Sequence, residues 1–158
     1  MQTFPKTVIW RHAKENLKKC SLTGLETRED MRFLTYPKDS FVSIENGCLL
    51  SLEGPPLSRN EASCQLILID ATWRRAKKME AWALAHQNIP KRSIPKGFVT
   101  AYPRRQQDCV DPDAGLSSIE ALYLAYLILG RNPSGLFASY YWKDVFFERN
   151  ERLLRAFQ

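Results

Sequence analysis

Residues 66–73, LILIDATW, decide the fold of this chain. An unbroken aliphatic run of this length is typical of a strand that is buried on both faces, as in the middle of a parallel sheet. The run stops at the carboxyl, hydroxyl and indole groups of Asp70, Thr72 and Trp73. Because ligands bind at the carboxyl ends of the strands in open α/β sheets, we expect a functional site at these three side chains.

The rest of the chain alternates between strand patterns and helix patterns. Strands are expected at 7–10, 32–35, 41–44, 48–52, 66–70 and 98–102, and helices at 74–85, 117–129 and 134–157. A partly helical stretch is expected at 13–25, and a capping box of Ser58 and Glu61 predicts a further short helix. This alternation predicts an α/β fold with a mostly parallel sheet. The length of 158 residues predicts a single domain over residues 1–158.

The composition is basic and lacks the signals of several protein classes. Lys and Arg number 23 against 17 Asp and Glu, a formal net charge of +6, which favours a polyanionic partner such as RNA. Neither GxGxxG nor GxxxxGK[ST] occurs, so a dinucleotide-type Rossmann site and a P-loop are not expected. With no signal-peptide pattern and no stretch long enough to span a membrane, we expect a soluble, cytoplasmic protein.

The cysteines are widely spaced and form no metal-ligand pattern. The four are Cys20, Cys48, Cys64 and Cys109, without a CxxC pair, and the chain has only two histidines. A disulfide framework is unusual in a domain this rich in apolar residues, and no zinc-ligand spacing is present. We therefore expect reduced thiols and no bound metal.

The helix expected after the buried strand carries a basic stripe. At helical spacing, Ala76, Met79 and Ala83 share one face, and the opposite face carries Arg74, Lys77 and Lys78. A cationic stripe beginning at the carboxyl end of a strand suits RNA phosphates. The simpler interpretation is a solvated helix face. Simpler roles also exist for Asp70, as the N-cap of this helix, and for Trp73, as a residue packed in the core.

Two blocks of the sequence resemble one known family. Residues 70–73, DATW, fit the D-x-T-W signature of the DTW-domain family. Residues 102–106, YPRRQ, followed after a variable loop by residues 116–122, LSSIEAL, are similar to its second block. Residues 18–21, KKCS, and 141–150, YWKDVFFERN, instead resemble the ends of the related Tsr3 family, although two residues intervene before Gly24. The two central blocks are fairly specific, and the resemblance spans most of the chain.

The resemblance implies a reaction, a cosubstrate and a fold. Enzymes of these families move the 3-amino-3-carboxypropyl group of S-adenosylmethionine to N3 of a uridine in RNA. The implied fold is SPOUT-like, with a mostly parallel sheet, helices on both faces and a C-terminal trefoil knot. The sulfonium activates its own leaving group, so this chemistry needs no metal. The remaining task of the site is to select which carbon on the sulfur meets the nucleophile, which is a matter of positioning.

Given this reaction, we expect roles for single residues. An apolar slot for adenine is expected from Leu50, Leu52, Pro55 and Trp73, with Thr72 shaping the loop. Asp70 is expected either to hold the amino group of the cosubstrate or to take the N3 proton of uridine. The second block adds cofactor-binding candidates at Tyr102, Ser118, Glu120 and Ala121, and RNA-binding candidates at Arg104 and Arg105 beside Arg74, Lys77 and Lys78. For Glu120, a capping box with Ser117 is an equally good explanation.

The identity of the RNA is divided between two substrates. The DATW and SSIEA blocks favour tRNA, whereas the length, the lack of an N-terminal cysteine cluster and the C-terminal helix favour ribosomal RNA. We predict a tRNA-uridine aminocarboxypropyltransferase, with the same transfer to small-subunit ribosomal RNA as the alternative. A SPOUT-like RNA methyltransferase and a non-catalytic RNA-binding factor are further alternatives. The sequence does not fix the oligomeric state and is compatible with a monomer.

Overall fold

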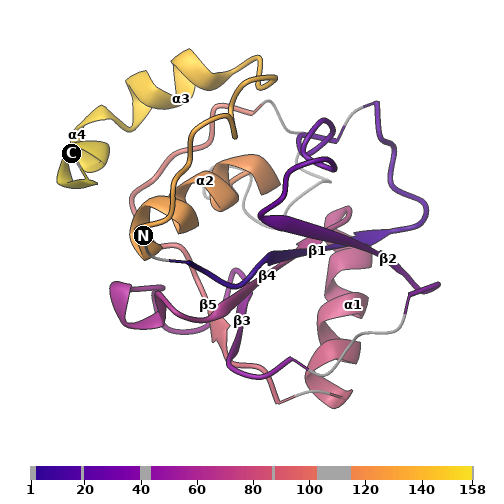
Figure 1. Ribbon diagram of the computed structural model, residues 1–158. Coiled ribbons are helices and arrows are strands. Elements are labelled where there is room, and N and C mark those ends of the chain that lie inside the picture. Colours follow the sequence, from indigo (N-terminus) through magenta and orange to yellow (C-terminus); the bar gives the residue numbers. More distant parts are fainter. Residues whose placement is uncertain (1–2, 19, 40–43, 87, 103–114, 158) are drawn as a thin grey trace.

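The computed structural model describes residues 3–18, 20–39, 44–86, 88–102 and 115–157. Its centre is a parallel sheet of five strands in the order β2-β1-β4-β3-β5 (Figure 1). The strands are β1 (Thr7–His12), β2 (Met31–Tyr36), β3 (Gly47–Leu50), β4 (Gln65–Asp70) and β5 (Lys91–Arg92). Every paired neighbour in the sheet is parallel. The carboxyl ends of all five strands therefore lie along one edge of the sheet.

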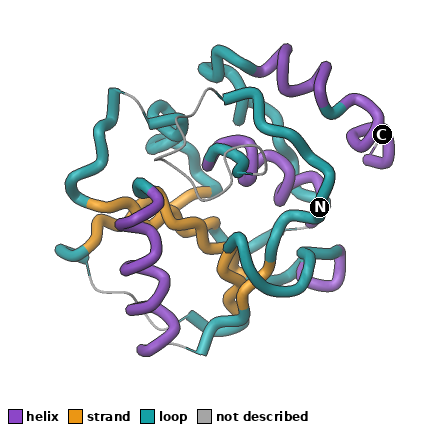
Figure 2. Tube along the Cα trace, turned by 180° about the vertical axis from the view of Figure 1, so that it is seen from behind, coloured by secondary structure: helices purple, strands orange, loops and turns teal. Residues whose placement is uncertain are grey.

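Helices cover both faces of the sheet, as Figures 1 and 2 show from opposite sides. The main helices are α1 (Trp73–His86) and α2 (Ser118–Leu129), followed by α3 (Lys143–Arg149) and α4 (Glu151–Leu154). Side chains alternate along β1: Val8 and Trp10 share one core with α1, and Ile9 shares the other core with α2. This period-2 alternation follows from strand geometry and explains why the central strands are apolar throughout.

Helix α2 lies between the sheet and the C-terminal segment. Eight of its residues are buried, which matches its lack of a polar face. Ser117 and Glu120 form the predicted capping box at its start, and Gly130 ends it in the left-handed conformation at φ 74°. On the side away from the sheet, Phe137 and Phe146 pack in the same core as the helix. The C-terminal segment thus adds a further layer over α2.

Most of the expected elements are confirmed with small changes of boundary. The strands at 7–10, 32–35, 48–52 and 66–70 and the helices at 74–85 and 117–129 correspond to β1, β2, β3, β4, α1 and α2. The short helix at Ser58 is a 3-10 turn, η1 (Arg59–Glu61), with both halves of its capping box present. The strand expected at 41–44 falls mainly outside the described residues.

Three expectations about local structure are wrong. Residues 98–102 form an irregular segment and not a strand, because side chains take up their backbone groups: Asn150 binds both the N–H and the C=O of Val99. The fifth strand of the sheet is instead β5, which lies between Pro90 and Pro95. The described part of 13–25 forms turns. The long helix expected at 134–157 begins only at Lys143 and is interrupted at Asn150, beyond which it ends in a 3-10 turn, η3 (Arg155–Phe157).

Within the described part of the chain, no helix combines the length and the apolar character that crossing a membrane requires.

Candidate active site

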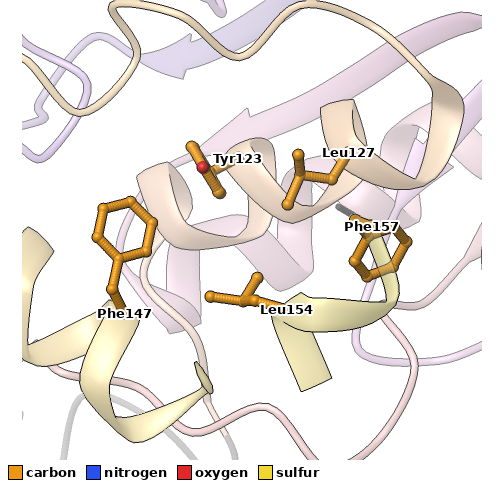
Figure 3. A pocket seen from close by; sticks show the side chains of 5 residues that line it. All are labelled: Tyr123, Leu127, Phe147, Leu154 and Phe157. Carbon is orange, nitrogen blue, oxygen red and sulfur yellow. The ribbon is translucent and has the colours of Figure 1, made fainter. Parts of the chain in front are cut away.

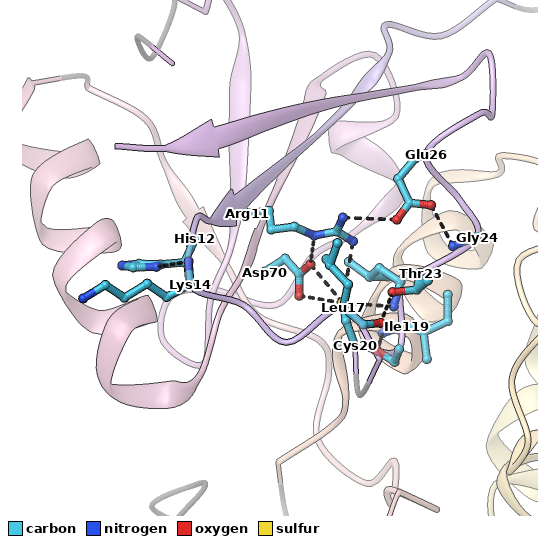
Figure 4. A network of polar contacts seen from close by, with 12 residues as sticks. Arg11, His12, Lys14, Leu17, Cys20, Thr23, Gly24, Glu26, Asp70 and Ile119 are labelled. Carbon is cyan, nitrogen blue, oxygen red and sulfur yellow. Dashed lines mark hydrogen bonds and ion pairs between the residues drawn. The ribbon is translucent and has the colours of Figure 1, made fainter. Parts of the chain in front are cut away.

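The ends of the two central strands are joined by a buried ion pair. Strands β1 and β4 are neighbours, and Arg11 lies opposite Asp70 in their register. Arg11 Nε donates a hydrogen bond of 2.8 Å to Asp70 Oδ2, and Asp70 is only 3% exposed. The guanidinium also donates to Glu26 Oε1 at 3.1 Å (Figure 4). Asp70 is therefore enclosed and paired.

A thiol completes the surroundings of this carboxylate. Cys20 Sγ donates to Asp70 Oδ2 at 3.1 Å and lies 3.4 Å from Oδ1. Burial, followed by the charge of Asp70 and this hydrogen bond, raises the pKa of the Cys20 thiol to about 11. The thiol is therefore neutral at physiological pH and acts as a donor. Cys48 and Cys64 are free thiols as well, as predicted, and Cys109 lies outside the described residues.

The turn that carries Cys20 also contacts helix α2. The backbone N–H of Ile119, in the first turn of α2, donates to Ser21 Oγ at 3.2 Å (Figure 4). The carboxyl ends of β1 and β4, the turn at 20–21 and the start of α2 thus meet at one place. These segments can meet because β1 and β4 are neighbours in the sheet, which sets residues 11 and 70 side by side. Both side chains lie on the face of the sheet that α2 covers.

A second carboxylate lies beside Asp70. In the loop that leaves β1, Glu15 presents its carboxylate so that one oxygen, Cys20 Sγ and an oxygen of Asp70 lie within 4.8 Å of one another. Its Oε2 is buried and has no hydrogen-bond partner among the described residues. Burial and the charge of Asp70 raise the pKa of Glu15. Three such ligand atoms could share a cation, but the guanidinium of Arg11 already supplies positive charge here.

Glu120 is fully occupied by protein donors. It is 0% exposed and accepts hydrogen bonds from Thr100 Oγ1 at 2.6 Å and from the Ala101 N–H at 2.8 Å. The Ser117 N–H at 2.8 Å and the Tyr140 hydroxyl at 2.9 Å complete the set. The capping interpretation is therefore correct. This carboxylate fixes the irregular segment at 100–101 against the start of α2, so any influence on a ligand is exerted through that segment.

The other residues of the second block lie around the start of α2. Ser118 and Ala121 are half-buried in its first turns. Tyr102 is half-buried as well, and its ring stacks on Tyr140 with the centroids 6.5 Å apart. Ser21 and Ile119 link this region directly to the group formed by Arg11, Glu15, Cys20 and Asp70. We call this group the Asp70 cluster. The structure thus brings the second block close to the DATW block.

The residues expected to form the adenine slot are spread over several environments. Leu50, at the end of β3, is buried in the α2 core, whereas Leu52 is 66% exposed. Pro55 is exposed on the turn that follows, and its carbonyl accepts from the Ser93 N–H at 2.9 Å. Trp73 is half-buried, and Lys77 Nζ lies 4.6 Å from its ring centroid. An adenine contact at these residues stays a prediction.

The start of α1 shows that Asp70 is not an N-cap. The first helical hydrogen bond runs from the Ala76 N–H to the Thr72 carbonyl, two residues after Asp70. The carboxylate instead points to the α2 side of the sheet, where Arg11 and Cys20 lie.

The basic stripe on α1 has the predicted orientation. Met79 and Ala83 are fully buried against the sheet, and Arg74, Lys77 and Lys78 are exposed. The stripe begins four residues after Asp70, so it lies beside the cluster along the chain. Arg104 and Arg105 lie outside the described residues, and their expected RNA contacts stay predictions.

Sequence reasoning missed two members of the cluster, Arg11 and Glu15, and gave Cys20 no role. The available signal was the change from apolar to charged residues at the end of the first strand, which repeats the pattern at Asp70. What could not be read locally was the adjacency of β1 and β4, which are separated by more than fifty residues.

A small apolar pocket lies elsewhere, between α2 and the C-terminal segment (Figure 3). It has a volume of about 110 Å³ and is lined by Tyr123, Leu127, Phe147, Leu154 and Phe157. It shares no residue with the Asp70 cluster and offers one hydroxyl as its only side-chain polar group, so it is a gap in helix packing and not a place for chemistry.

Together, the parallel sheet covered on both faces and the polar cluster at its carboxyl edge define an α/β protein with the site geometry of that class. The chain belongs to the DTW-domain family, whose model matches residues 1–158. No curated protein sequence matches it. Its fold is similar to the structure of the SAM-dependent rRNA:acp-transferase Tsr3 from Vulcanisaeta distributa, with a TM-score of 0.72 and 21% identity. That match covers 98% of this chain and 83% of the other. The predicted resemblance to both families is confirmed.

Proposed function

We propose that this protein transfers the 3-amino-3-carboxypropyl group of S-adenosylmethionine to N3 of a uridine in RNA. The observation that carries the proposal is the D-x-T-W signature of a DTW-domain chain, located at the carboxyl end of a central strand with its aspartate buried and paired. The fold is shared with a solved enzyme described as a SAM-dependent rRNA acp-transferase, which supports the same class of reaction.

The chain offers groups that suit such a cosubstrate. The carboxylate of Asp70, although paired with Arg11, keeps lone-pair sites that an ammonium of the cosubstrate could use. The exposed Leu52 and the half-buried Trp73 supply apolar surface for adenine. When bound, S-adenosylmethionine supplies an activated carbon–sulfur bond. The work of the residues is then to orient the substituents on sulfur so that the aminocarboxypropyl carbon faces the RNA.

The exposed stripe on α1 is the proposed RNA contact. Arg74, Lys77 and Lys78 are free of the core and begin beside the D-x-T-W loop, so phosphates bound there would bring a nucleotide to the carboxyl edge of the sheet. Arg104 and Arg105 are proposed to extend this surface.

For the RNA itself we propose tRNA, on the strength of the DATW and SSIEA blocks. Transfer to small-subunit ribosomal RNA is the second candidate, and the likeness of the fold to a ribosomal RNA enzyme supports it. We further propose a single cytoplasmic domain with a SPOUT-like trefoil knot near the C-terminus.

Nucleoside analysis of tRNA and small-subunit ribosomal RNA from a deletion strain tests the proposal. We expect aminocarboxypropyl-uridine to disappear from tRNA and to return with the wild-type gene. Its loss from ribosomal RNA alone would move the function to the second candidate. A methyl-sized mass missing from RNA would identify a methyltransferase instead.

Calorimetry with S-adenosylmethionine addresses the non-catalytic alternative. We expect measurable binding that Trp73→Ala weakens at least about tenfold, because the indole would lose its contact with the ligand. Tyr141→Ala is the matched control, since this aromatic residue is 84% exposed and lies on the C-terminal segment. If the wild-type protein binds RNA but not the cosubstrate, the non-catalytic alternative holds.

A further inference from the structure

We propose that Glu15 is the general base that takes the N3 proton of the target uridine, and that Asp70 holds the cationic part of the cosubstrate. The inference rests on the proposed function. The sequence offered two roles for Asp70: to hold the amino group of the cosubstrate or to take the N3 proton. The inference assigns these roles to two neighbouring carboxylates.

The first argument is free hydrogen-bonding capacity. Asp70 is 3% exposed, and both of its oxygens lie within hydrogen-bond range of Cys20, with Arg11 Nε bound to Oδ2. Glu15 is half-buried, so its side chain reaches solvent, yet its Oε2 is buried without a partner among the described residues. A general base needs a free lone pair within reach of the substrate proton. Glu15 has an unused lone pair on Oε2 and a side chain that reaches solvent, whereas the lone pairs of Asp70 are largely in use.

The second argument is position. Glu15 lies in the turn that follows β1, where its N–H donates to the His12 carbonyl at 3.0 Å. This turn fixes its backbone at the same sheet edge as the D-x-T-W loop. Its carboxylate is within 4.8 Å of both Asp70 and Cys20. A substrate held by Asp70 would therefore present its reacting carbon next to Glu15.

The third argument is charge. Burial and the anionic Asp70 raise the pKa of Glu15, while Arg75, Arg11 and a backbone hydrogen bond from Thr72 oppose the rise. Arg75 is held nearby, because its guanidinium donates to the Lys14 carbonyl at 3.1 Å. A carboxylate with a raised pKa is a stronger base than an ordinary one. Two adjacent carboxylates in different environments are the usual setting for separate roles.

The proposed step balances as follows. The bond from uridine N3 to the γ-carbon of the aminocarboxypropyl group forms as the bond from that carbon to sulfur breaks. The electron pair of the broken bond stays on sulfur, which becomes the neutral thioether of 5′-methylthioadenosine. The N3 proton moves to the carboxylate of Glu15 and is released to solvent after the products leave.

The test is Glu15→Gln, which keeps the size of the side chain and removes its basicity. Single-turnover rates with saturating S-adenosylmethionine and RNA would be measured across the pH range, beside calorimetry of cosubstrate binding. We expect binding to change less than about twofold and the rate at neutral pH to fall about 10²-fold or more, the usual contribution of a general base. Glu29→Gln is the matched control, because Glu29 is exposed and lies at the opposite edge of the sheet, just before β2.

The pH profile separates a base from a structural role. The wild-type rate should fall as the pH drops through the raised pKa of Glu15, because a protonated carboxyl cannot accept the N3 proton of uridine. Glu15→Gln should lack this limb, and its defect should shrink in alkaline solution, where uridine N3 ionises without help. Glu15→Asp should restore part of the rate.

Two results would overturn the inference: a wild-type rate for Glu15→Gln at neutral pH, or a loss of the same factor at every pH in a variant that unfolds at the wild-type temperature. If the variant does not fold, Glu15→Asp and the acid limb of the wild-type profile decide, and the absence of that limb rejects the base. A wild-type protein that binds S-adenosylmethionine but transfers nothing to any RNA rejects the proposed function, and the inference with it.

Discussion

At the scale of single residues, the direct partners of the Asp70 carboxylate are one cation and one neutral donor. Arg11 neutralises the carboxylate within 2.8 Å, and Cys20 contributes a hydrogen bond without adding charge. An ion pair this enclosed depends on both partners, because removing one leaves an uncompensated charge at a cost of about 3–5 kcal/mol. The carboxylate is therefore held in one orientation before any ligand arrives.

Cys20 should be a slow nucleophile. With a pKa of about 11, its thiolate fraction at pH 8 is roughly 100-fold lower than that of an ordinary cysteine. We expect alkylation by iodoacetamide at pH 8 to be slower by about that factor, and Asp70→Asn to accelerate it, because the carboxylate raises the pKa. Peptide-resolved mass spectrometry measures the rate, with the unfolded protein as the reference. Equal rates in the folded and unfolded protein would contradict the assignment.

The residues of this cluster were predictable only in part. Asp70 and Trp73 follow a buried strand and match a signature, so the sequence alone indicates them. Arg11, Glu15 and Cys20 approach Asp70 because β1 pairs with β4, and no local pattern records which strands become neighbours. A charged residue at the end of a strand marks a candidate position but does not name its partner.

At the scale of elements, Glu120 joins three segments that are far apart in the sequence and are not linked by backbone pairing in a helix or sheet. Thr100 and Ala101 belong to an irregular segment, Ser117 caps α2, and Tyr140 lies in the C-terminal segment. The charge on the carboxylate is spread over four donors, which makes burial at 0% exposure tolerable.

Replacing Glu120 should therefore cost more than replacing any one of its donors. Glu120→Gln turns an acceptor into an N–H that faces other donors, and we expect a loss of about 2–4 kcal/mol in the free energy of unfolding. Tyr140→Phe removes one hydrogen bond and should cost about 1 kcal/mol. Urea unfolding measures both, and Glu148→Gln, an exposed change on α3, should stay within about 0.5 kcal/mol of wild type. A cost for Glu120→Gln no larger than that of the control would show that the four contacts are not made in solution.

Elements with a strong local pattern were predictable and those stabilised from a distance were not. The aliphatic run of β4 and the capped apolar helix α2 are specified by their own residues. The segment at 98–102 has the composition of a strand, yet Asn150 and Glu120 bind its backbone from far along the chain. The same Asn150 donates to the Phe146 carbonyl where the C-terminal helix breaks.

At the scale of the whole molecule, the two faces of the sheet carry different functional groups. The α2 face holds the Asp70 cluster, and α1, on the opposite face, carries the basic stripe. The two meet at the carboxyl edge, because α1 begins three residues after Asp70. An RNA bound along α1 would reach the cluster from the end of the sheet.

Binding of RNA should then depend on salt in a way that the stripe controls. Replacing Arg74, Lys77 or Lys78 by Ala should each reduce the slope of log K against log salt by about 0.7–0.9, the value of one phosphate contact. Fluorescence titrations at several salt concentrations measure the slope. Lys6→Ala is the control, since Lys6 is exposed just before β1, at the opposite edge of the sheet. Unchanged slopes for all three replacements would remove α1 from the RNA surface.

The ion pair between Arg11 and Asp70 also constrains how the sequence can change during evolution. A lineage that lost the arginine while keeping the aspartate would carry a buried negative charge with only a thiol to stabilise it. Positions 11 and 70 are thus expected to covary, despite their separation of 59 positions along the chain. A relative that keeps DATW without a cation at the end of its first strand is expected to have another counter-ion beside the aspartate or to leave that aspartate exposed to water.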